Sequence, residues 1–346
     1  MGFASPNAHS KFAFLIEHNP FIPPAAIRSA HAQTIVAALI PRRTRLLDGN
    51  TEARCFDVAP GTRVLGHCSW QDRRRNAPTM IVVHGMEGSS ISPYMLSTAE
   101  KAIAAGFNCI RLNIRNCGGT EGWTATLYHA GSTEDLHRII DELIVRDRLR
   151  EIYVAGFSLG GNIVLKLAGE LGGNAPAELR GIAAISPSVD LESCVETIER
   201  PSNLLYHWRF IRSLKTRMRK KARLFPDRFD ASLLHGLRSI RQFDDRFTAP
   251  HCGFKDSGDY YRRASALPYL PGIQVPTLII HAKDDPLIPY APLERNELIA
   301  NPNLLLLAPE NGGHVGFVSV PDTAGDRFWA ETKAIDFFKA LGNGQF

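Results

Sequence analysis

The chain of 346 residues is 44% hydrophobic and 22% charged, the composition of an ordinary globular protein with a large buried core. Its net charge of +5 comes from one run, in which eight basic residues and no acidic one lie between Arg209 and Arg223. Because the rest of the chain is net negative and no apolar run has the length of a membrane span, neither a general nucleic-acid-binding surface nor a bilayer-spanning segment is expected.

The cysteines form no C-x-x-C pair and, with histidine, no zinc-binding spacing. They are Cys55, Cys68, Cys109, Cys117, Cys194 and Cys252. This usage predicts free thiols in a reducing, cytoplasmic compartment, with no metal and no other cofactor. A signal peptide is not expected, because the apolar run at residues 12–16 is short and Glu17 ends it.

Residues 1–45 predict an N-terminal arm, in which Pro20, Pro23 and Pro24 precede a short amphipathic segment at residues 26–39. Two weak strands are expected at residues 51–58 and 63–70. From Thr79 onward, continuous apolar runs alternate with helical periodicity, which predicts a mostly parallel sheet with helices on both faces. The expected strands are residues 79–84, 107–114, 152–157, 181–186, 276–281 and 303–308, and the expected helices are residues 92–105, 132–143, 159–169 and 328–341.

Residues 191–265 contain no strand candidate and interrupt this alternation. One helical face is expected here, formed by Leu204, Trp208, Ile211, Leu214 and Met218. The segment predicts a helical cap over the active site. The cap is inserted into a core formed by residues 46–190 and 266–346. The alternative is a surface insertion that plays no part in catalysis. The basic run is expected to be a solvated face, or else to attract acidic substrates or touch an anionic membrane weakly through residues 208–223.

A G-x-S-x-G pentapeptide, residues 156–160, stands between an expected strand and an expected helix. In this context the serine, Ser158, is held on a sharp turn with its hydroxyl exposed above the sheet edge. A serine hydroxyl is a poor nucleophile, so this motif predicts a base, an orienting acid and an oxyanion site elsewhere in the chain.

The oxyanion site is expected after the strand at residues 79–84. Gly85 permits a tight turn there, which would aim the Met86 N–H into the site beside the N–H of Leu159. His84 belongs to this turn and is expected to be structural.

Two aspartates compete for the role of the orienting acid after the strand at residues 276–281. Asp285 is preferred, Asp284 is expected to cap or to form a salt bridge, and Asp190 on a neighbouring loop is a weaker candidate. After the last strand, His314 lies between glycines that leave it room to act as the base. The chain order Ser, Asp, His is typical of one hydrolase architecture.

The chain resembles the α/β-hydrolase superfamily and, within it, the YheT-like branch of bacterial hydrolases, which is related to mammalian ABHD lipases. The resemblance runs from about residue 21 to the closing helix, and no counterpart of the lipases' N-terminal membrane anchor is expected. Matching stretches are residues 31–35, 84–89, 92–94, 128–131, 156–162, 243–245, 253–254, 259–261, 282–289 and 313–317.

The resemblance implies Ser158 as nucleophile, His314 as base, Asp285 as acid, and Met86 and Leu159 as oxyanion donors. It also implies hydrolysis of a small-molecule carboxylic ester. Acyl transfer to an alcohol or amine, and a ligand-binding protein without catalysis, stay as alternatives. Trp123, Tyr128 and Trp208 are expected to shape the substrate pocket.

Overall fold

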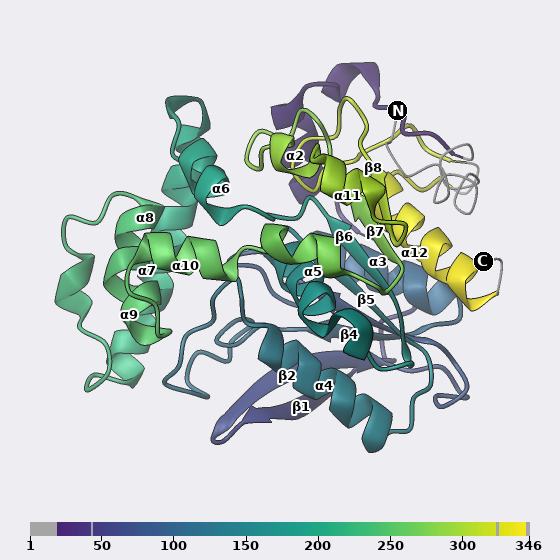
Figure 1. Ribbon diagram of the computed structural model, residues 1–346, viewed down its shortest axis with the longest axis horizontal. Coiled ribbons are helices and arrows are strands. Elements are labelled where there is room, and N and C mark those ends of the chain that lie inside the picture. The colour runs from purple at the N-terminus through teal and green to yellow at the C-terminus, as the bar shows by residue number, and fades with distance from the viewer. Residues whose placement is uncertain (1–18, 43, 323–324, 344–346) are drawn as a thin grey trace.

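The computed structural model describes residues 19–42, 44–322 and 325–343. Its centre is an eight-stranded sheet with the order β1-β2-β4-β3-β5-β6-β7-β8 (Figure 1). The strands are β1 Glu52–Ala59, β2 Thr62–Ser69, β3 Thr79–Val83, β4 Asn108–Leu112, β5 Ile152–Phe157, β6 Leu179–Ile185, β7 Thr277–Ile280 and β8 Leu304–Leu307. Strands β3 to β8 pair in parallel, and β1 and β2 extend the sheet as an antiparallel edge.

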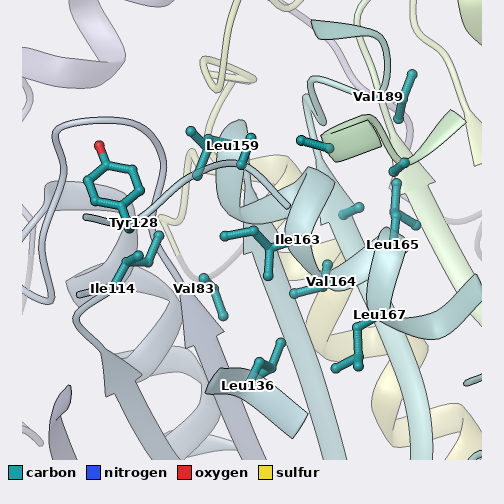
Figure 2. Packing of buried hydrophobic residues seen from close by; sticks show 14 of the residues in the cluster. Val83, Ile114, Tyr128, Leu136, Leu159, Ile163, Val164, Leu165, Leu167 and Val189 are labelled. Atoms are coloured by element: carbon teal, nitrogen blue, oxygen red, sulfur yellow. The ribbon is translucent and has the colours of Figure 1, made fainter. Parts of the chain in front are cut away.

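Helices cover both faces of the sheet, because the parallel strands are apolar on both sides. Helices α3 (Pro93–Ala104) and α12 (Trp329–Gly342) pack on one face, and α4 (Thr133–Val145) and α5 (Leu159–Leu171) pack on the other. Figure 2 shows Ile163 and Leu167 of α5 in one packed group with Val83 of β3. The expected fold is therefore confirmed.

The remaining elements are shorter helices and turns. Helices α2 (Ala30–Leu39) and α11 (Asn296–Ala300) lie outside the two covering pairs. Short 3-10 turns occur at Ala25–Ile27, Gly172–Asn174, Pro201–Asn203, Ala231–Leu234, Leu267–Gly272 and Ala291–Leu293. Helix α4 begins without a side-chain cap, because the Ser132 side chain does not bond to its first turn and the Asp135 carboxylate binds Arg115.

Residues 191–265, which we call the helical insertion, are fully described and contain no strand. Their helices are α6 (Leu191–Ile198), α7 (Leu204–Leu224), α8 (Ile240–Phe243), α9 (Ala249–His251) and α10 (Ser257–Ala264), with a π-helical turn at Asp244–Thr248. Figure 1 shows α7 to α10 gathered at the left of the view, to one side of the sheet.

The apolar face expected along this insertion is only half right. Ile211, Leu214 and Met218 are buried, whereas Leu204 and Trp208 are more than 60% exposed. Apolar spacing at the start of α7 therefore does not lead to burial of these two side chains, although Tyr206 and Phe210 of the same segment pack against the core.

The basic run is not a uniformly solvated face, which corrects a second expectation. Lys221 is buried, and its ammonium donates to Asn116 Oδ1 at 3.0 Å and to the carbonyl oxygens of Glu121, Thr124 and Thr126. Burial, followed by the charge of Arg217, lowers the pKa of Lys221 to about 8. Lys221 therefore joins α7 to the loop that follows β4.

Candidate active site

Ser158 lies on a strained turn between β5 and α5, with φ +52° and ψ −117°. Glycine is required on both sides of it. A Cβ at Gly156 would lie 2.3 Å from the Gly160 oxygen, and a Cβ at Gly160 would lie 2.5 Å from the His84 oxygen. This close passage of backbones holds the serine above the sheet edge.

The structure brings Ser158, His314 and Asp285 into one hydrogen-bonded line. His314 Nε2 lies 3.0 Å from Ser158 Oγ, and His314 Nδ1 lies 2.8 Å from Asp285 Oδ2. Since the carboxylate can only accept, Nδ1 carries the hydrogen and Nε2 of the neutral ring is free to accept the serine proton.

The loop that carries Asp285 holds its carboxylate in position to accept the hydrogen bond from His314. Its Oδ1 accepts hydrogen bonds from the amides of Leu287 at 2.9 Å and Ile288 at 3.0 Å. Burial alone would raise the pKa of Asp285, but His314 and the amide of Ile288 hold that pKa below its ordinary value. The carboxylate therefore stays charged at neutral pH.

The two competing aspartates have other partners. Asp284 accepts from the Gly313 amide at 2.9 Å and from Asn311 Nδ2 at 3.3 Å, so it fixes the loop that carries His314. Asp190 stands before the first residue of α6, and neither of its carboxylate oxygens bonds to His314.

Helix α2 supports the same histidine loop from a distant part of the sequence. Thr34 Oγ1 accepts from the His314 amide at 2.9 Å. The Gln33 side chain donates to the Val318 oxygen at 2.9 Å and accepts from the Val318 amide at 2.7 Å. Sequence reasoning missed these two residues, although both lie in the matching stretch at residues 31–35.

The turn after β3 leaves one backbone donor without a partner. The amides of Gly85 and Glu87 donate to the hydroxyls of Tyr94 at 3.0 Å and Tyr128 at 3.4 Å. The Met86 amide between them has no acceptor among the described residues. Leu159, as the first residue of α5, also has an amide with no partner inside the helix.

His84 stabilises this turn through hydrogen bonds of its ring, and its role is structural, as expected. Its Nδ1 lies 2.7 Å from the Gly85 oxygen, and its Nε2 accepts from the Ile114 amide at 3.1 Å. These partners require a neutral ring with its hydrogen on Nδ1, and burial lowers the pKa of His84 to about 4.

The same turn is joined to helix α7 by a part-buried ion pair. Glu87, whose φ is +59°, pairs with Arg217. Arg217 also donates to the Tyr128 hydroxyl at 3.1 Å, and Ser213 donates to Glu87 Oε2 at 2.6 Å. The backbone beside the Met86 amide is thus fixed by side chains of the helical insertion.

A cavity of about 460 Å³ opens onto the triad. Ser158, Leu159, His314, Met86 and Tyr128 all line it. Apolar side chains of the helical insertion form much of the inner wall, among them Leu191, Val195, Phe210, Leu214, Ile240 and Phe243.

Two residues expected in the pocket lie outside this wall, which corrects the prediction for them. Trp208 is 61% exposed and stacks with Arg212, whose guanidinium carbon is 5.4 Å from the ring centroid. Trp123 lies under Arg63 at the protein surface. Both rings therefore contact arginine rather than the cavity.

Within the described ranges, no group of three or more His, Cys, Asp or Glu side chains is arranged to hold a metal ion. In the same residues, no helix combines the length and apolarity that a membrane span requires.

Comparison with known proteins agrees with the fold. Residues 78–321 match the alpha/beta hydrolase fold family. The chain is 31% identical over 322 residues to YheT of Escherichia coli (strain K12), named as a candidate esterase, and covers 92% of each chain. It is 30% identical over 242 residues to Phospholipase ABHD3 of Mus musculus, covering 70% of this chain and 58% of that protein.

Among solved structures, the Pyrococcus furiosus esterase Pf2001 superposes with a TM-score of 0.55 at 16% identity. The match covers 86% of this chain and 98% of the esterase, and it concerns the fold alone. The chain therefore belongs to the alpha/beta hydrolase fold family, in the branch that contains YheT. This confirms the resemblance seen in the sequence.

Proposed function

We propose that the protein hydrolyses carboxylic esters through an acyl-enzyme formed on Ser158. The family and the relatives named esterase, lipase and phospholipase make it a carboxylic ester hydrolase. The observation that carries the mechanism is the hydrogen-bonded line from Ser158 through His314 to Asp285.

In the first half of the reaction, Ser158 Oγ attacks the ester carbonyl while His314 Nε2 takes its proton. Asp285 holds the ring and stabilises the imidazolium that forms. His314 then gives the proton to the leaving alcohol, and the acyl group stays on Ser158. In the second half, water takes the place of the serine hydroxyl, and the same ring first accepts and then returns a proton.

The tetrahedral oxyanion is proposed to bind between the amides of Met86 and Leu159. Both residues line the cavity beside Ser158, and neither amide has an acceptor within the turn or helix that carries it. A donor of this kind contributes on the order of 3 kcal/mol to the stability of the transition state.

The helical insertion is proposed to act as a cap that holds the acyl chain of the substrate. Its apolar side chains line the cavity next to Ser158, and a cavity of about 460 Å³ has room for more than an acetyl group. A carboxylic ester with an acyl chain of medium or greater length is the substrate class that this wall fits.

The test is hydrolysis of p-nitrophenyl esters of graded acyl length by the wild type and by Ser158→Ala. Turnover is expected to fall about a thousandfold or more in the variant, because the nucleophile is removed, while thermal unfolding stays nearly unchanged. Ester turnover that persists in Ser158→Ala would place the nucleophile elsewhere. Adding an alcohol to the wild-type assay measures acyl transfer, since a transferase would release a new ester in place of the acid.

A further inference from the structure

The mouth of the cavity lies between two helices that are far apart in the sequence. Ile35 and Leu39 of α2 line it on one side, and Arg209 and Phe210 of α7 line it on another. The two helices meet at His31 and Tyr206, whose rings stack with centroids 5.7 Å apart. Figure 1 shows the turn between α6 and α7 projecting from the body of the protein on the side of α2.

Large apolar side chains are exposed on these two helices and on the turn after β3. Leu205 is 81% exposed, Leu39 is 74% exposed and Trp208 is 61% exposed. Ile91, in the turn between the lining residues Gly88 and Pro93, is 67% exposed. Exposed apolar groups gathered at the opening of an apolar cavity mark a binding surface, whereas scattered ones do not.

Positive charge accompanies these apolar groups. Leu205, Trp208, Arg209 and Arg212 follow the spacing of one helical face, and both arginines are exposed. Neither α2 nor α7 contains an acidic residue. Arg217 is turned inward to Glu87, so the exposed face belongs to the first half of α7 and not to the whole basic run.

The geometry points to a docking surface for an anionic phospholipid membrane, formed by α2, the turn at Ile91 and the first half of α7. Apolar side chains enter the headgroup region, while Arg209 and Arg212 bind lipid phosphates. A lipid acyl chain then faces the cavity mouth without first crossing water. Only this last step rests on the proposed ester hydrolysis; the docking itself does not need it.

The experiment measures flotation of the full chain with vesicles of phosphatidylcholine, alone or with about 30% phosphatidylglycerol. Leu205→Ser with Trp208→Ser is expected to lower binding to the mixed vesicles about tenfold, because two inserted side chains are lost. Arg209→Gln with Arg212→Gln is expected to lower binding to the mixed vesicles and to leave binding to phosphatidylcholine alone unchanged. The control for the apolar variant is Val145→Ser, which changes an exposed side chain on α4. The control for the charge variant is Arg138→Gln with Arg150→Gln, which changes exposed arginines away from the mouth.

The apolar double variant should hydrolyse soluble p-nitrophenyl butyrate at the wild-type rate, which shows that it is folded. Ser158→Ala should bind vesicles like the wild type, so loss of turnover with intact binding would overturn the proposed function alone. A wild type that fails to float, or an apolar double variant that floats like Val145→Ser, overturns the docking surface. It is also overturned if light scattering shows that the apolar variant splits a dimer, because the surface then binds a second copy.

Discussion

The histidine loop shows how single residues hold the site in place. Val315 and Phe317 have φ values of +52° and +43°, which are costly for bulky side chains. The Val315 amide donates to Ser186 Oγ at 3.0 Å, and the His314 amide donates to Thr34. Hydrogen bonds from separate elements therefore offset the backbone strain beside the His314 ring.

Replacing Thr34 by Val should slow catalysis by about threefold to tenfold, because the His314 amide loses its acceptor at a cost of about 1 kcal/mol. The measurement is kcat for p-nitrophenyl acetate, together with the rate at which a fluorophosphonate labels Ser158. Thr216→Val is the matched control, since the Thr216 hydroxyl bonds only to the Arg212 oxygen within its own helix. Equal kcat values in the two variants would show that Thr34 does not position the base.

Asp244 gives a prediction about pH. It is buried beside the cavity, and its carboxyl accepts from the hydroxyls of Thr248 at 2.6 Å and Tyr261 at 2.7 Å. Burial raises the pKa of Asp244 from 3.8 to about 7, and the carboxylates of Asp245 and Glu199 add to the rise. Between these pH values the folded protein holds a proton that the unfolded chain has lost, so this group makes the protein less stable as pH rises.

The effect could reach about 4 kcal/mol by pH 8, and Asp244→Asn, which stays neutral, should remove it. The melting temperature of the variant relative to the wild type is therefore expected to rise by several degrees between pH 5 and pH 8. Differential scanning fluorimetry at the two pH values measures it, with Asp227→Asn, an exposed site in the same insertion, as control. A constant difference would mean that Asp244 is charged at both pH values.

At the scale of elements, helix α7 and the turn after β3 form one unit. The part-buried pair of Glu87 and Arg217 connects them, and neither side chain is more than one-sixth exposed. Breaking such a pair leaves an unpaired charge in the interior, which is more costly than losing the contact itself.

Arg217→Met should therefore lower the free energy of unfolding by about 3 kcal/mol and should also lower kcat, because the backbone at Met86 loses its support. Urea unfolding and steady-state kinetics measure the two effects. Arg219→Met, an exposed change on the same helix, is the control. Adding Glu87→Gln to Arg217→Met should restore part of the stability, and no recovery would argue against a coupled pair.

Much of this arrangement of elements could be predicted from the sequence, because continuous apolar strands and helical periodicity are local signals. The loops that carry Ser158, Asp285 and His314 follow directly from that pattern, and their roles stay a prediction that the geometry supports. The exposure of the Trp208 side chain and the inward direction of the Arg217 side chain could not be predicted, since helical spacing alone does not show which side chains find a partner. The contact of Thr34 with His314 joins residues 280 positions apart, and no local signal encodes it.

At the scale of the whole molecule, the site lies where three parts of the chain meet. The sheet edge carries Ser158, Asp285 and His314, α2 supports the histidine loop, and the helical insertion supplies the apolar wall. Chain-length preference should therefore depend on the insertion, while the chemistry depends on the sheet edge.

Val195→Phe in α6 should reduce kcat/KM for p-nitrophenyl decanoate about tenfold or more relative to the acetate, because the added ring fills part of the cavity. The ratio of the two kcat/KM values is the measurement, and it cancels differences in active enzyme concentration. Val145→Phe, at an exposed position of α4, should leave that ratio unchanged. A proportional loss on both esters would mean that acyl chains do not lie against α6.

The pairing of Gln33 with Val318 has a consequence for how the protein is made. Val318 follows Gln33 by 285 residues, so α2 is synthesised long before the loop with which it pairs. Until that loop has been synthesised, the hydrogen bonds that Gln33 and Thr34 make with it cannot form. The surroundings of His314 can therefore be completed only after these two segments, which are distant in the sequence, have come together.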